Sequence, residues 1–182
     1  MNSRALWGFV ATFAIVAVVA RLVPHMPNVT PVGALALFVG LNVRKSWMIW
    51  VLVPGVMVIT DAFIGFYTPG IMAAVYASFL LIVGLGAAAR KFPRIGAVAG
   101  GSVAGSTLFF VVTNLAVWGF SGMYAPTMGG LMLCYVLALP FYGYMLVGDL
   151  AWNAVLSGSY GLYPKMARRP LSSAPGGMTP VH

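Results

Sequence analysis

Few residues of this chain could do chemistry, because 61% of its 182 residues are hydrophobic and only 7% are charged. Its two carboxylates are Asp61 and Asp149, and one basic residue, Arg21, stands apart from the basic clusters. A charge inside a membrane costs about 2.5–3.5 kcal/mol on insertion scales, so such a residue generally has a partner or a function. These three residues are therefore the first candidates for a functional site.

A stiff polar segment, RLVPHMPNVTP, begins at Arg21 and also holds His25 and Asn28. Asp61 lies in ITDAFIGFY and Asn114 in VVTNLAVWGF. Each is near the end of an apolar run that is expected, from the charge distribution described below, to face the outside of the cell. We expect Arg21, Asp61 and Asn114 at one depth, with an ion pair between the first two. Two interpretations stay open: the pair contributes to a solute site, or it only clasps the helices while Arg21 reaches toward the headgroups.

Further candidates lie in or near the outer connectors. His25 could contact a ligand, coordinate a metal or cap the first helix. Trp118 and Tyr124 flank a glycine-containing connector, and the alternative for both is the aromatic belt of a membrane interface. Cys134, the single cysteine, is expected to pack as a small apolar residue, and its second interpretation is a soft ligand to a metal-containing substrate. The predicted substrate-binding set is Arg21, His25, Asn28, Asp61, Asn114, Trp118 and Tyr124.

Asp149 lies toward the cytoplasmic end of the last apolar run, and Asn153 follows one turn later on the same helix face. Arg44 or Arg90 could neutralise its charge. The pair Asp149 and Asn153 is either a coupling or docking point for a cytoplasmic partner or an internal clasp. A membrane enzyme using Asp61, His25 and Asp149 is disfavoured, because acid–base groups must reach one substrate and the two carboxylates lie at opposite depths. We predict neither an enzyme nor a cofactor.

The elements that position these residues are membrane spans. A soluble domain has about 25% charged residues, whereas a spanning helix needs about 20 mostly apolar ones. The sequence predicts an all-α integral membrane bundle of six helices, the second of them short, over residues 1–163. Residues 164–182 are rich in Pro, Ser and Gly and are expected to form a disordered cytoplasmic tail. The expected helices are 4–23, 31–43, 47–66, 70–89, 95–118 and 127–157, with a kink near Pro140.

The basic residues set the orientation. With six spans, nine of the ten Lys and Arg residues fall on one side and only Arg21 falls on the other. Positive loops stay in the cytoplasm, so both termini are expected there, in the cytoplasmic (inner) membrane of a bacterium. The net charge of +8 then reflects these loops and not nucleic-acid binding. The nine residues are Arg4, Arg44, Lys45, Arg90, Lys91, Arg94, Lys165, Arg168 and Arg169.

The motifs RxxPHxxNxxP, TDxxIGF, TNxxVW and CYxxALPF, the last followed by GD, carry a resemblance over about Ala5 to Gly158. The chain resembles the S component of an energy-coupling factor (ECF) transporter, and more closely a family of small uncharacterised membrane proteins near those components. The resemblance implies binding of a vitamin or trace nutrient at the outer face. It also implies import by toppling in the lipid bilayer, driven by an ECF coupling subunit with ATPases.

The small residues of the first helix depart from the AxxxA-type docking face that the resemblance implies, because they recur every third position from Gly8 to Ala20. Cobalamin is suggested as a solute by the same resemblance, without any ligand residue. The predicted function is therefore a substrate-binding membrane subunit that captures and imports a small solute. The alternative is a structural or assembly subunit of a larger complex, using small-residue faces such as Gly96, Gly100 and Ala104.

Overall fold

The computed structural model describes residues 3–23, 29–44 and 47–167. These ranges contain six α-helices and no strand, so the all-α expectation is confirmed. The helices are α1 (Ser3–Leu22), α2 (Val32–Asn42), α3 (Met48–Ile64), α4 (Pro69–Ala89), α5 (Arg94–Phe120) and α6 (Met128–Ala167).

Four of the helices, α1, α4, α5 and α6, are long and apolar enough to cross a membrane. The other two, α2 and α3, are apolar but shorter. Many large apolar side chains point outward, such as Ile15 on α1 and Val51 on α3, both more than half exposed. A bundle with an apolar exterior indicates a membrane protein, in which lipid covers these side chains.

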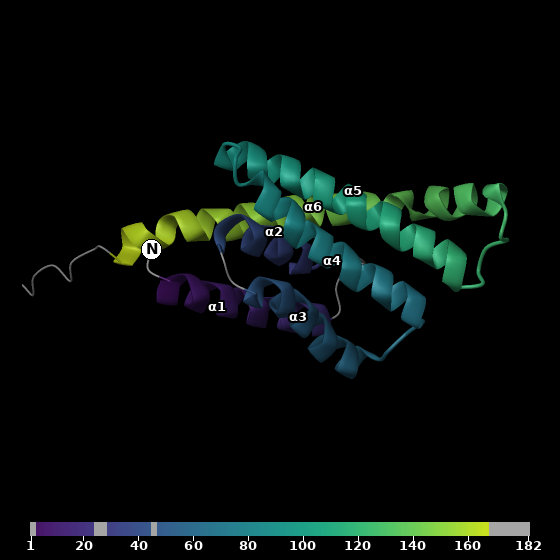
Figure 1. The fold of residues 1–182 in the computed structure, drawn as a ribbon, viewed down its shortest axis with the longest axis horizontal. Helices are drawn as coiled ribbons and strands as arrows, with labels where there is room; N and C mark the ends of the chain where they lie inside the picture. Colours follow the sequence, from purple (N-terminus) through teal and green to yellow (C-terminus); the bar gives the residue numbers. More distant parts are fainter. Residues whose placement is uncertain (1–2, 24–28, 45–46, 168–182) are drawn as a thin grey trace, which may run out of the picture.

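The short helix α2 is the centre of the bundle. It has 11 residues, and those from Val32 to Gly40 are all buried. It contacts every other helix, and Figure 1 shows it between the α1 and α3 pair and the α5 and α6 pair. A helix that is hydrophobic all round is a buried helix, so α2 forms the core of the bundle and is not a lipid-facing span.

Close packing of α2 against α4 depends on two glycines. A Cβ atom at Gly86 would lie 2.5 Å from the carbonyl oxygen of Leu37, and one at Gly40 would overlap the carbonyl oxygen of Val83. Small residues at such crossings let two helix backbones approach closely. Arg90, just after α4, then donates from Nε to Gly40 O (2.7 Å) and from Nη2 to Val43 O (2.5 Å). These bonds satisfy carbonyl groups at the C-terminal end of α2.

The last helix, α6, is the longest. It has 40 residues, continues through Pro140 and ends at Ala167, so the boundary expected at 163 falls inside it. At 1.5 Å per residue it is about 60 Å long, roughly twice the thickness of a bilayer core. The tail beyond Ala167 lies outside the described residues.

Connections alternate between the two ends of the bundle (Figure 1). The N-terminal end of α1, the C-terminal end of α6 and the α4–α5 connection lie toward one end. The α3–α4 and α5–α6 connections lie toward the other. This arrangement places the C-terminal ends of α1 and α3 and the N-terminal end of α4 away from the N-terminal end of α1 and the C-terminal end of α6.

Candidate solute-binding site

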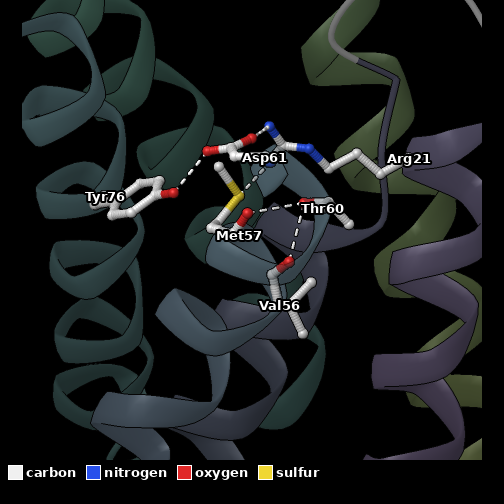
Figure 2. Close-up of polar contacts among 6 residues, drawn as sticks. All are labelled: Arg21, Val56, Met57, Thr60, Asp61 and Tyr76. Carbon is white, nitrogen blue, oxygen red and sulfur yellow. Dashed lines mark hydrogen bonds and ion pairs between the residues drawn. The ribbon is translucent and has the colours of Figure 1, made fainter. Parts of the chain in front are cut away.

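An ion pair joins α1 to α3, as the sequence predicted. Arg21 Nη2 lies 2.5 Å from Asp61 Oδ1, and Arg21 Nη1 also donates to the sulfur of Met57. The hydroxyl of Tyr76 on α4 donates to the other carboxylate oxygen, Oδ2, at 2.6 Å. Figure 2 shows Asp61 between Arg21 and Tyr76. One carboxylate thus holds three helices together.

The neighbouring residues of α3 leave the Asp61 carboxylate available to the other helices. The hydroxyl of Thr60 bonds to the carbonyl oxygens of Val56 (2.9 Å) and Met57 (3.0 Å) one turn earlier, so it does not compete for the carboxylate (Figure 2). Gly65 ends the helix with φ of 111°, and its N–H bonds to the carbonyl oxygen of Asp61. This backbone conformation favours glycine. Asp61 therefore lies in the last turn of α3, fully buried.

A cavity of about 440 Å³ lies beside the ion pair. Ligand sites in proteins typically have volumes of about 300–1,000 Å³, with apolar walls and a few polar groups. This cavity follows that pattern, because Arg21, Tyr67 and Asp149 interrupt walls that are mostly apolar. Its lining residues are Arg21, Thr30, Gly33, Met57, Ile64, Tyr67, Val75, Phe79, Ile82, Phe109, Met145 and Asp149.

A second cavity of about 300 Å³ adjoins the first and shares Tyr67, Val75, Phe109 and Met145 with it. Asn114 lines only this second cavity. The amide nitrogen of Asn114 donates to a carbonyl oxygen of its own helix at 2.8 Å. Asn114 is thus part of the same hollow region as Arg21 but is not bonded to the ion pair.

Tyr67, in the α3–α4 connection, borders both cavities. Burial and the nearby Asp61 carboxylate raise the pKa of its phenol above the usual 10. The hydroxyl therefore stays protonated at neutral pH and can donate a hydrogen bond to a solute. Next to this connection, the ring of Phe120 packs over Gly70, where a Cβ atom would lie 2.7 Å from the ring. The C-terminal end of α5 therefore contacts the N-terminal end of α4.

Trp118 and Tyr124 do not line either cavity. The indole of Trp118 donates to the carbonyl oxygen of Ala125 at 3.0 Å, which fixes the connection between α5 and α6. Cys134 is 1% exposed and its thiol faces the carbonyl oxygen of Asn114 at 3.5 Å. The residues that the structure describes contain no cluster of three His, Cys, Asp or Glu side chains around a metal position. Packing is the role that this geometry supports for Cys134.

Asp149 and Asn153 lie inside the bundle, 7% and 1% exposed. The hydroxyl of Ser106 donates to Asp149 Oδ2 at 2.7 Å, and Asn153 Nδ2 donates to Ser102 Oγ at 2.9 Å. Arg90 does not reach Asp149, because its guanidinium bonds to carbonyl groups of α2. Both side chains face α5 and are covered by it, and neither is on the surface that a docking partner would contact.

The comparisons with known proteins give a family but no activity. The model of a family of unknown function, DUF6580, matches residues 1–171. The chain belongs to this family. No curated protein and no solved structure matches the chain.

The ion pair between Arg21 and Asp61 was predicted correctly, but Asp149 was expected in a separate region of the protein. The structure places Asp149 on the wall of the same cavity as Arg21. Tyr76, the second partner of Asp61, was missed because nothing in its helix distinguishes it from other aromatic residues. A signal for the Ser102 and Ser106 contacts did exist, since these serines repeat the four-residue spacing of Asp149 and Asn153. His25 and Asn28 lie outside the described residues.

Proposed function

We propose that this protein binds a small solute in the cavity beside Arg21 and carries it across the bilayer. The cavity is the observation on which the proposal rests: about 440 Å³, inside an apolar bundle, with polar groups at separate points of its wall. A helix bundle needs no such hollow for stability, because protein interiors are normally close-packed. A solute that fills it would gain apolar and polar contacts along its wall.

The lining favours a solute with a largely apolar body and a few polar groups. Phe79, Phe109 and Met145 offer apolar contacts, while Tyr67 and Arg21 offer hydrogen-bond donors. Asp61 does not line the cavity and instead holds the Arg21 guanidinium in place. This chemistry suits the vitamin or trace-nutrient class expected from the resemblance to S components.

The proposed location is the inner membrane of a bacterium, with both termini in the cytoplasm. The support is the distribution of basic residues together with the alternation of connections in Figure 1. The cavity residues Arg21 and Tyr67 then lie toward the outer face. An ECF coupling subunit with ATPases is a proposed partner, because the resemblance to S components implies one that drives net import.

Mass spectrometry of the purified, detergent-extracted protein tests the proposal. We expect a small molecule that co-purifies with the wild type and is absent from Val75→Trp, in which an indole occupies part of both cavities. Val51→Trp is the matched control, because Val51 is 54% exposed on the lipid-facing surface, and it should keep the molecule. A ligand-free wild type, or equal amounts on both variants, would count against the cavity as a solute site.

An assembly role is the second candidate, supported by one surface of α5. Gly96, Gly100 and Ala104 are exposed, and a Cβ atom at either glycine would meet nothing within 4 Å. Such a small-residue face allows close packing of another helix. Purification with a stoichiometric protein partner and no bound small molecule, lost on Gly100→Ile, would favour this role over solute binding.

A further inference from the structure

A buried polar cluster lies between α5 and α6. Asp149 and Asn153 are one turn apart on α6, and Ser102 and Ser106 are one turn apart on α5. Two hydrogen bonds join the helices, from Ser106 to Asp149 (2.7 Å) and from Asn153 to Ser102 (2.9 Å). All four residues are at most 7% exposed.

One atom of this cluster is buried without a hydrogen-bond partner, and its carboxylate has no counter-charge among the described residues. No cation in the described part of the chain pairs with the Asp149 carboxylate, because the ion pair found there joins Arg21 to Asp61. The amide oxygen of Asn153, Oδ1, is buried without a hydrogen-bond partner. The Ser102 hydroxyl donates to Val98 O at 2.8 Å and accepts from Asn153 Nδ2, which agrees with this orientation of the amide.

One ligand would satisfy both groups. Asp149, Asn153 and Ser102 line a common small space that is too narrow for a water molecule. A glycine on α2 allows Asp149 to approach that helix closely: a Cβ atom at Gly33 would lie 2.6 Å from Asp149 Oδ1. We propose that Asp149, Asn153 and Ser102 bind a single sodium ion through their side-chain oxygens.

The charge and the size of the site select this ion. Hard cations bind to carboxylate, amide and hydroxyl oxygens, which are the oxygen types present here. One positive charge balances the single carboxylate, whereas a divalent ion would leave a net charge buried in the bilayer, at high cost. The narrow space favours sodium over the larger potassium ion. A proton on Asp149 is the alternative to the ion, because it would also remove the buried charge.

The position of the ion gives it a role in transport. Asp149 lines the 440 Å³ cavity as well as the narrow space, so a bound sodium ion would stand beside the solute. Binding of the ion and of the solute would then strengthen each other by the same factor. This coupling rests on the proposed function, whereas the ion site itself does not.

Thermal unfolding in detergent, without added solute, tests the ion site. At constant pH and ionic strength, the Tm of the wild type should be higher in sodium chloride than in potassium or choline chloride. Saturation to about ten times Kd should raise Tm by about 3–6 °C. Asp149→Asn and Ser102→Ala should lose this sodium-dependent shift.

Ser78→Ala is the matched control for Ser102→Ala. Ser78 is also buried and its hydroxyl bonds to a carbonyl oxygen one turn earlier, Ala74 O at 2.7 Å, but it does not border the narrow space. This variant should keep the full sodium shift even if its Tm is lower. Ser102→Ala retains the carboxylate, so it keeps the test valid if Asp149→Asn does not fold.

Three results would overturn the sodium site: equal Tm in all three salts, an unchanged sodium shift in Ser102→Ala, or a Tm that follows pH but not sodium. The last result would assign a proton to Asp149. Because no solute is present in this measurement, its failure would leave the proposed solute cavity intact. Conversely, a sodium shift in a protein that carries no solute would support the ion site alone.

Discussion

Removing the Asp61 carboxylate should destabilise the bundle strongly. Asp61 is fully buried and Arg21 is 17% exposed at its side chain, so Asp61→Leu leaves a guanidinium inside the protein without a counter-charge. Breaking a buried pair from one side costs about 3–5 kcal/mol. Arg21→Met leaves the opposite charge unpaired and should cost a similar amount.

The double variant Arg21→Met/Asp61→Leu should be more stable than either single variant. Replacing a whole buried ion pair with apolar side chains is often close to neutral, and only the Tyr76 hydroxyl then loses its acceptor. Unfolding free energies of the wild type, both single variants and the double variant form a complete cycle, measurable in one detergent. A double variant whose loss equals the sum of the single losses would refute the coupling that the 2.5 Å contact implies.

The same double variant separates a site from a clasp. If Arg21 contributes a donor to the solute, the refolded double variant should carry no co-purifying molecule. If the pair only holds α1 against α3, solute content should follow stability and return to the wild-type level. We expect loss, because Arg21 lines the cavity whereas Asp61 does not.

Two further predictions concern packing and orientation. Gly40→Ala should lower the unfolding free energy by about 1–3 kcal/mol or more, since the new methyl group meets the α4 backbone. Gly100→Ala is the control, because a Cβ atom at Gly100 meets nothing within 4 Å. This variant should be neutral or slightly stabilising in the same unfolding assay. In a protein without its native cysteine, Met123→Cys should react with a membrane-impermeant maleimide on intact cells and Phe92→Cys should not. The reverse labelling pattern would invert the proposed orientation.

The sequence predicted the helices well because its signals there are local. Apolar runs separated by Pro, Gly and basic residues fix the helix positions to within a few residues, apart from the end of α6. That helix continues ten residues past the expected end at 157, although prolines at 140 and 164 suggested interruption. In a membrane bundle, neighbouring helices can satisfy the backbone groups that proline frees, so proline is a weaker boundary signal than in water.

The cavity could not be predicted because it depends on packing around α2. The sequence shows that α2 is short, but not that every other helix contacts it. Its central position brings Asp149 of α6 and Arg21 of α1 to one cavity, although their helices place them at different depths. The Arg21–Asp61 pair was predictable, because an apolar membrane bundle offers each of these two charged side chains very few other charged partners.

Counterflow exchange in proteoliposomes tests the central claim, solute transport through the cavity, most directly, because exchange needs no ATPase. Vesicles containing the wild type, loaded with the molecule that co-purifies with it, should take up an isotope-labelled copy from outside. Vesicles with Val75→Trp should behave like protein-free vesicles. Exchange by Val75→Trp at the wild-type rate, or no exchange by the wild type above protein-free vesicles, would contradict the account.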